Sequence, residues 1–407
     1  MTTAVLTNRL PSRAASFTDA ALPTAARLWY LTAVAGQLVF AFAVASFYAS
    51  AVVRGNLAAW NRFMPHGYVA GETVGNVAVA VHLLAAVFII LSGAIQLVPQ
   101  VRHRAPSFHR WNGRLYMLAA FAVSLAGLHM LWVRGSVNDL TQRLGISLNA
   151  VLIMVCAAMA LRSAIGRDFK THRRWALRLF LVVSGVWFVR VGMTLSFLLF
   201  KGPIGFDPRT GQGPFITFLV YGSYLIPLAV LELYLRAERS GATGRIAMAS
   251  ALLFLTVAMG AGIVGATVGS WVPRIKAAYD GRKSIGQTLA ATIASQGIDA
   301  AVGQYHQLEA AQPAAYNFDQ RELNSLGYEL IRDRRFKEAI RVFALNVEAY
   351  PRSSNAYDSL GEAYMADGDK AQAIANYKIA LFLDAANLSS AEALQKLGVP
   401  RQPPSPK

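Results

Sequence analysis

Histidine and arginine side chains inside apolar stretches are the residues of this sequence that could do chemistry. His82, His129 and Arg190 each interrupt a long apolar stretch, while His109 and His172 stand beside arginines at the start of two others. Ionisable groups within a membrane are costly and usually face the interior of a helix bundle. Because a helix rises ~1.5 Å per residue, His82, His129 and Arg190 fall at a similar depth. We therefore predict a polar cluster at that level.

Haem binding is one interpretation of these histidines. Facing histidines of a helical bundle commonly hold haem iron. His109 and His172 make one candidate pair of ligands for haem b, and His82 and His129 make another. Arg190 could neutralise a propionate or bind a quinone carbonyl, as in a membrane oxidoreductase component. However, His109 and His129 are about 30 Å apart along one helix, the full hydrocarbon thickness. At most one pair is therefore expected to hold a buried haem.

A transporter, channel or sensor is a second interpretation. Histidine titrates near neutral pH, so His82 and Arg190 could bind a ligand or relay protons. Against this, the sequence shows no clear inverted repeat and has few carboxylates in its apolar stretches. It also lacks hydrolase, zinc-protease, Walker and dinucleotide-binding motifs, so we do not expect a soluble-type enzyme.

Two similar segments begin apolar stretches, FHRWNGRLY from Phe108 and THRRWALR from Thr171. Each has a histidine, an arginine, a nearby tryptophan and then another arginine. The simpler interpretation is an interfacial anchor, with aromatic rings at the headgroups and arginines reaching toward anionic lipid.

The elements that position these residues are transmembrane helices. Hydrophobic residues make up 55% of the 407 residues, charged residues only 15%, and the mean hydropathy is +0.37. A span needs about 20 apolar residues. Seven stretches qualify, and their short connections predict an up-down bundle. They are 28–53, 75–98, 114–133, 146–164, 175–200, 215–236 and 246–270.

The positive charge predicts the orientation. Of the lysines and arginines flanking the seven stretches, sixteen lie on the side of the N-terminus and six on the other. The positive-inside rule then places the N-terminus in the cytoplasm and, after seven spans, the tail outside. The net charge of +17 thus reflects loops beside the bilayer, and we expect no nucleic-acid partner. The N-terminus lacks the apolar core of a signal peptide, and Cys156, the single cysteine, excludes an internal disulfide.

The tail contains a 34-residue repeat. Gly327 recurs as Gly361, Ala339 as Ala373, and Phe343 as Tyr377. This is the tetratricopeptide arrangement, in which small residues let two helices approach and aromatic residues fill the space between repeats. Because two repeats bury little core, we expect 284–312 to supply a further packing pair. The glycine-rich stretch 260–269 is instead expected to allow close helix packing in the seventh span.

His82 with GAIQLVPQVR, HRWNGRLY, and HRRW followed by Arg190 resemble a family of uncharacterised bacterial membrane proteins, domain of unknown function number two thousand three hundred and six. The resemblance covers roughly 75–200 and implies a multi-pass fold without an agreed activity. His129 departs from the family pattern. The matching positions are His82, His109, Arg110, Gly113, Arg114, Tyr116, His172, Arg173, Trp175 and Arg190.

The tail, including LNSLGYEL, resembles a helical-repeat appendix found behind exported bacterial hydrolases, which favours an extracytoplasmic location. The favoured function is thus a bacterial inner-membrane anchor or scaffold, whose tail binds a protein partner through Tyr328, Tyr357 and Tyr364. We predict an all-α chain, a seven-helix transmembrane bundle followed by a soluble tetratricopeptide-type domain. The predicted segments are a disordered N-terminus 1–27, the bundle 28–270, a helical linker 271–319, the repeats 320–395 and a disordered tail 396–407.

Overall fold

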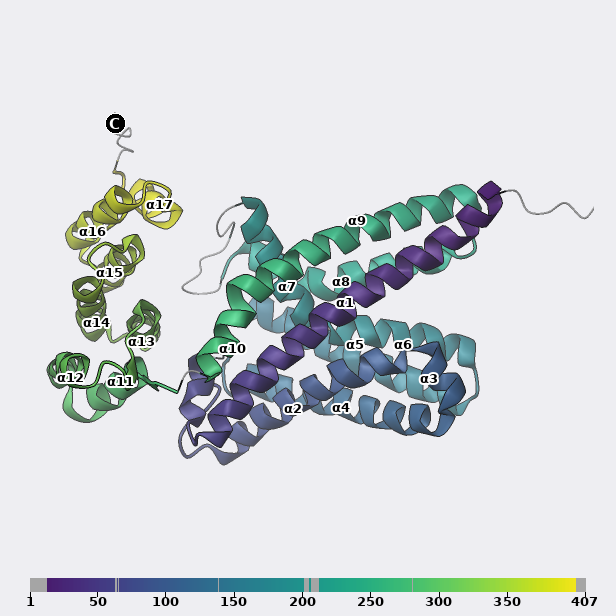
Figure 1. Cartoon of the computed structure of the whole chain (residues 1–407), viewed down its shortest axis with the longest axis horizontal. Helices are drawn as coiled ribbons and strands as arrows, with labels where there is room; N and C mark the ends of the chain where they lie inside the picture. Colours follow the sequence, from purple (N-terminus) through teal and green to yellow (C-terminus); the bar gives the residue numbers. More distant parts are fainter. Residues whose placement is uncertain are drawn as a thin grey trace, which may run out of the picture. The chain divides into compact units, whose positions relative to one another are not determined.

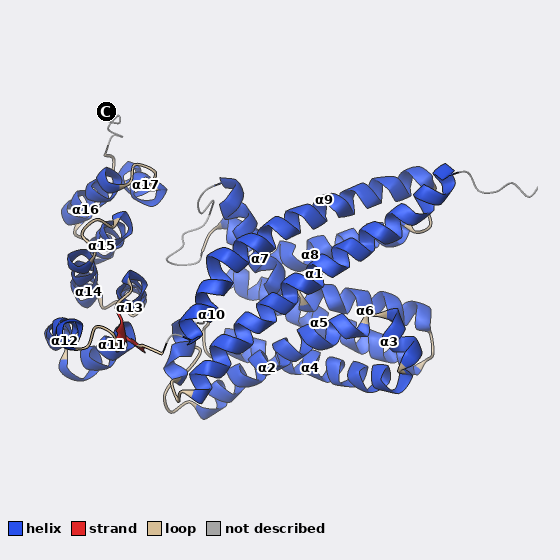
Figure 2. Cartoon of the chain, in the orientation of Figure 1, coloured by secondary structure: helices blue, strands red, loops and turns tan. Residues whose placement is uncertain are grey.

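A computed structural model describes residues 13–62, 64, 66–137, 139–200, 205, 212–279 and 281–399. The chain divides into two compact units, Met1–Tyr279 and Asp280–Lys407. Unit 1 is built from α1 (Arg13–Val53), η1 (Leu57–Arg62), α2 (Thr73–Gln96), α3 (Pro99–Arg104), α4 (Pro106–Trp132), α5 (Leu140–Ile165), α6 (Phe169–Val183), α7 (Gly185–Phe200), α8 (Pro214–Ala237), α9 (Ala242–Ala266), η2 (Thr267–Trp271) and α10 (Val272–Tyr279). The predictions of an all-α chain and of several membrane-spanning helices are confirmed (Figure 2).

Among the described residues, six helices are long and apolar enough to cross a membrane, and there are seven if the bent pair α6–α7 counts as one span. The stretch 175–200, predicted as one span, bends by 52° between Val183 and Gly185, which the sequence did not indicate. At the bend, the Ser184 hydroxyl donates to the Phe180 carbonyl at 2.7 Å, a side-chain bond that competes with the helical ladder. Gln37 of α1 donates its amide to Ser184 Oγ at 2.9 Å.

The first helix begins at Arg13, well before the predicted start at residue 28. Tertiary packing explains the extension, because Leu22 and Ala25 are buried against Met248 and Leu252 of α9. Residues 1–12, which we predicted to be disordered, lie outside the part of the chain that the structure describes.

Unit 1 pairs its first and last spans, so that α1 and α9 run side by side, while α2 packs along α4 (Figure 1). Two glycines of the 260–269 stretch, Gly262 and Gly265, pack closely as expected, whereas Gly260 and Gly269 have no neighbour within 4 Å. A methyl group on Gly262 or Gly265 would lie 2.7 Å from Val191 or Leu198 of α7. One core cluster joins α2, α4, α5, α6 and α8, and another joins α1, α7, α9 and η2.

Unit 2 is a succession of helix pairs with one core cluster from α11 to α15 and a second in α16 and α17. Gly327 of α13 lies against the Phe343 ring of α14, and Gly361 of α15 lies against the Tyr377 ring of α16. The same contact thus recurs 34 residues later. The helices are α11 (Ile285–Gln296), α12 (Ile298–Ala311), α13 (Gln320–Arg332), α14 (Phe336–Ala349), α15 (Ser354–Asp367), α16 (Lys370–Leu383) and α17 (Leu388–Lys396), with a parallel pair of strands, β1 (Lys283–Ser284) and β2 (Tyr316–Asn317).

The segment 284–312 forms the expected packing pair, because α11 contacts α13 and α12 contacts α14. Residues 400–407 of the predicted disordered tail lie outside the described residues. The two units also differ sharply in charge. Residues 1–279 contain 25 lysines and arginines against 7 acidic residues, and residues 280–407 contain 14 against 15. The positive charge therefore belongs to the bundle.

Candidate functional site at the arginine-rich end of the bundle

The end of α2 and the start of α4 are joined by side chains of the two motifs GAIQ and HRWNGRLY. Ser92 donates to Asn112 Oδ1 at 3.0 Å, and Gln96 donates to the His109 carbonyl at 3.0 Å. Gly93 lies against the Tyr116 ring, which a methyl group at Gly93 would meet at 3.1 Å. These contacts give a structural reason for both motifs, since they fix where α4 begins and hence where His109 lies.

His172 is held by α5. Its Nδ1 lies 2.9 Å from the Ala160 carbonyl, and because a carbonyl only accepts, Nδ1 carries the hydrogen. The other nitrogen, Nε2, is then the one available to a ligand. His109 interacts electrostatically with His172 and Arg102. Its own Nδ1 is buried without a hydrogen-bond partner. The structure thus brings together two of the predicted histidines, His109 and His172.

Both motifs build the same stack of arginine on tryptophan. The guanidinium of Arg114 lies 4.8 Å from the Trp111 ring centre, and that of Arg178 lies 4.8 Å from the Trp175 ring centre. Because the spacing is three residues in each case, one helical turn aligns the two groups. Arg178 also pairs with Glu232 at 2.6 Å. Glu232 is therefore an ion-pair partner and not only a solvated carboxylate.

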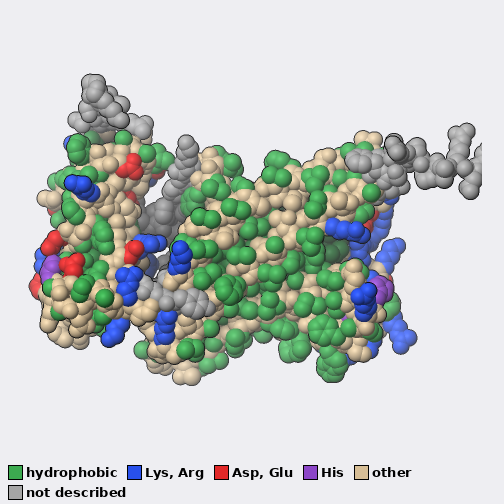
Figure 3. All heavy atoms as spheres, in the orientation of Figure 1, with side chains coloured by type: hydrophobic (Ala, Val, Ile, Leu, Met, Phe, Trp, Pro, Cys, Tyr) green, Lys and Arg blue, Asp and Glu red, His purple; other side chains and the backbone are tan. Residues whose placement is uncertain are grey.

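We call this region the arginine-rich end: α3, the first two turns of α4, and the connections α5–α6 and α8–α9. Figure 3 shows lysine, arginine and histidine side chains gathered there, beside an apolar surface. Its carboxylates are few, and Glu238 pairs with Arg173 at 3.4 Å. Among the described residues, most arginines of this end have no ion pair with a carboxylate. Examples are Arg102, Arg104, Arg110, Arg114, Arg167 and Arg239.

In the described part of the bundle, no hydrogen bond or ion pair joins His82, His129 and Arg190 into the predicted cluster. His82 Nδ1 lies 3.0 Å from the Val123 carbonyl of α4, and the His82 ring lies beside Gly127. His129 is two residues beyond Gly127, so it points about 200° away around α4. The Nδ1 of His129 is buried without a partner. The body of α4 thus separates His129 from His82.

Arg190 lies in α7 beyond the bend. Its guanidinium is 5.4 Å from the Phe40 ring centre of α1, and it interacts electrostatically with Tyr48. Its Nε is buried without a hydrogen-bond partner. Arg190 therefore faces α1, whereas His82 faces α4.

Sequence reasoning missed Gln37 and Trp187. Gln37 is only 2% exposed and binds the bend at Ser184, and the signal for it was a lone amide in an apolar stretch. Trp187 is 2% exposed, and its Nε1 has no acceptor. No periodicity marks a buried tryptophan as polar, so it could not have been found from the sequence.

No group of three or more histidine, cysteine or carboxylate side chains suited to a metal ion occurs among the described residues. A metal at the arginine-rich end would therefore rest on two imidazoles, as haem iron does.

Residues 79–235 match the model of the family described as "Predicted membrane protein (DUF2306)". The match extends from α2 to α8 and includes His82, His109, His172 and Arg190. The resemblance expected over 75–200 is thus confirmed, and it continues to residue 235. No curated protein and no solved structure matches the chain significantly. The matched segment and the apolar helices together make this a membrane protein of unknown function that contacts the lipid bilayer.

Proposed function

We propose that the protein is a membrane anchor whose unit 2 is a tetratricopeptide-type repeat domain that binds a protein partner. The observation that carries the proposal is the recurrence of the glycine–aromatic contact, Gly327 with Phe343 and Gly361 with Tyr377. Repeat domains of this class expose surfaces suited to peptides and proteins. Tyr328 also links successive repeats, because it donates to Glu362 at 2.6 Å.

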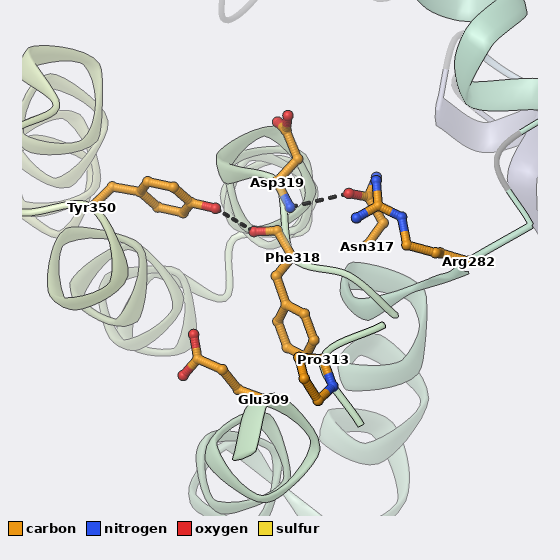
Figure 4. A pocket seen from close by; sticks show the side chains of 7 residues that line it. All are labelled: Arg282, Glu309, Pro313, Asn317, Phe318, Asp319 and Tyr350. Carbon is orange, nitrogen blue, oxygen red and sulfur yellow. Dashed lines mark hydrogen bonds between the residues drawn. The ribbon is translucent and has the colours of Figure 1, made fainter. Parts of the chain in front are cut away.

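A pocket in unit 2 suits a partner side chain. Its volume is about 410 Å³, and Figure 4 shows Tyr350, Phe318 and Glu309 around it. Tyr350 donates to the Phe318 carbonyl at 2.5 Å, so the aromatic wall is fixed. The hydrogen bond from Arg321 lowers the pKa of Asp319, which keeps that carboxylate ionised. Arg282 also lines the pocket, which therefore presents an aromatic wall beside side chains of both charges, a lining suited to a polar or charged side chain of the partner.

Contacts at the two ends of the bundle favour seven crossings of the membrane by the chain. At the arginine-rich end, α6 pairs with the end of α8 through Arg178 and Glu232. At the opposite end, Tyr221 near the start of α8 donates to the Thr141 carbonyl at the start of α5, at 3.1 Å. The bent pair α6–α7 then runs from one end to the other. With the arginine-rich end in the cytoplasm of a bacterial inner membrane, the N-terminus is cytoplasmic and unit 2 is extracytoplasmic.

Photo-crosslinking in cells tests the partner. A benzophenone amino acid at Glu309, in the pocket, should give a discrete adduct with a second protein, while one at the exposed Lys378 should not. Tyr357 and Tyr364 remain predicted contacts, and the same probe at these positions tests them. The absence of an adduct at Glu309, or equal adducts at Glu309 and Lys378, would contradict the proposal.

Haem b or quinone binding at the arginine-rich end is a second candidate, and it would make the bundle a redox component. The observation that favours it is the orientation of His172, whose Nδ1 is hydrogen-bonded to a carbonyl and leaves Nε2 for iron. His109 would supply the second imidazole, and the arginines would hold the propionates. A visible spectrum of protein from haem-replete cells should show a Soret band that His172→Ala abolishes, and a colourless folded preparation would exclude haem.

A further inference from the structure

Arg190 is a cation in a membrane span without a counter-charge. The candidate spans, as the structure describes them, contain a single carboxylate, Glu232, and it pairs with Arg178 at the arginine-rich end. The guanidinium of Arg190 makes no hydrogen bond or ion pair with a described residue, and its Nε is buried. Charged side chains within a membrane are normally paired, so Arg190 lacks the anion that would pair with it.

Two alternatives fail to supply the missing interaction. The Phe40 ring, 5.4 Å away, offers a cation–π contact, and Tyr48 interacts electrostatically with the guanidinium, but neither side chain is a carboxylate or other formal anion. Reaching the membrane surface along α7 is also excluded, because Arg190 lies ten residues before Phe200, or about 15 Å. That distance exceeds the length of an arginine side chain.

A second donor lies on the same face of α7. Trp187 precedes Arg190 by three residues, which is nearly one helical turn. Trp187 is 2% exposed, and its Nε1 has no acceptor. A methyl group at Gly36 of α1 would lie 2.8 Å from the Trp187 ring, and Phe40 is one turn further along α1. Both donors therefore face α1, and neither has an acceptor.

The bend between α6 and α7 adds a further group that favours an anion beside Trp187 and Arg190. Trp187 is in the first turn of α7, whose start at Gly185 lies inside the membrane, and the amide groups of a first helical turn favour negative charge. Broken spans of this kind bind anionic groups in other membrane proteins.

We propose that Arg190 and Trp187 bind the oxyanion, a phosphate or carboxylate, of a small molecule or lipid within the bundle. The guanidinium presents two parallel N–H groups to such an anion, and the indole N–H adds a third donor. This site is separate from the arginine-rich end and does not depend on unit 2.

Native mass spectrometry of the full chain released from nanodiscs tests the proposal. One arm uses phosphatidylcholine with phosphatidylglycerol, and the other uses phosphatidylcholine with added inorganic phosphate or oleate. A bound phosphatidylglycerol identifies a lipid headgroup as the ligand. An adduct with the mass of phosphate or oleate in the second arm identifies a free oxyanion. Arg190→Gln should weaken the adduct roughly tenfold or more, and Trp187→Phe should weaken it less.

Arg352→Gln is the control, because this exposed arginine lies in unit 2, outside the bundle, and should leave the adduct unchanged. Arg190→Lys should bind with intermediate strength, since lysine keeps the charge but loses the bidentate geometry. The proposal is overturned by folded wild-type protein without an adduct in either arm, or by adducts of equal strength in wild type and Arg190→Gln.

Discussion

At the residue scale, single glycines and one tyrosine set the packing of unit 2. Gly327 and Gly361 leave room for Phe343 and Tyr377, both of which are fully buried. Tyr328 donates to Glu362, itself only 5% exposed, so the phenol satisfies a buried carboxylate.

Replacing Gly327 tests the first of these contacts. In Gly327→Ala the new methyl group would meet the Phe343 ring at 2.5 Å, and we expect unit 2 to lose about 1–3 kcal/mol of unfolding free energy. Gly303→Ala is the control, because nothing lies within 4 Å of that helical position, and it should stabilise by up to about 1 kcal/mol. Thermal unfolding of the purified chain measures both. Equal melting temperatures for the two variants would argue against the contact.

Tyr328 predicts a dependence on alkaline pH. Burial, with Glu362 adding to it, raises the pKa of Tyr328 well above 10.0. A raised pKa means that the stabilisation is complete below the unfolded pKa near 10 and falls as pH rises beyond it. Unit 2 should therefore lose stability above about pH 10, and Tyr328→Phe should flatten this dependence while costing roughly 1–3 kcal/mol at neutral pH. Denaturation followed across the pH range measures both effects, and a steep alkaline loss retained in Tyr328→Phe would place its origin elsewhere.

At the scale of elements, the sequence predicted the spans and the 34-residue repeat. Both are marked by regular patterns, long apolar stretches for the spans and recurring small and aromatic residues for the repeat. It did not predict the bend at Ser184, since the hydrogen bond from Gln37 joins residues 147 positions apart. The similar depth of His82, His129 and Arg190 along their helices was also not enough to predict a cluster, because depth along a helix does not say which way a side chain faces. His109 and His172, predicted as a pair because each lies near the start of a helix at the same end, interact electrostatically.

The ion pairs between α6 and α8 give an element-scale prediction. Arg178 donates two hydrogen bonds to Glu232, at 2.9 and 2.6 Å, whereas Arg173 donates one to Glu238 at 3.4 Å. The Arg178 side chain is also less exposed than that of Arg173, 22% against 52%, although Glu232 is more exposed than Glu238, 43% against 33%. Glu232→Gln should therefore lower stability by about 1–2 kcal/mol, and Glu238→Gln by less than about 0.5 kcal/mol. Melting temperatures in detergent at low and high salt separate the two. A larger loss in Glu238→Gln would reverse this ranking.

At the scale of the whole molecule, the charge is divided between the units. The bundle holds the excess of lysine and arginine, and unit 2 is close to neutral. Such a bundle suits a membrane with anionic lipid on one side, which orients it, whereas a neutral repeat domain suits contact with a protein. This division supports the anchor with an extracytoplasmic tail.

We propose above all that seven crossings of the membrane separate the arginine-rich end from unit 2. Cysteine labelling in intact cells tests this topology most directly. The single cysteine makes Cys156→Ala a cysteine-free background. Into it we would introduce, one at a time, Ser107→Cys at the arginine-rich end, Ala70→Cys in the loop before α2, and Lys378→Cys in unit 2, all at exposed positions. An impermeant maleimide should label Ala70→Cys and Lys378→Cys but label Ser107→Cys only after the cells are opened. Labelling of Ala70→Cys without Lys378→Cys in intact cells would contradict the account.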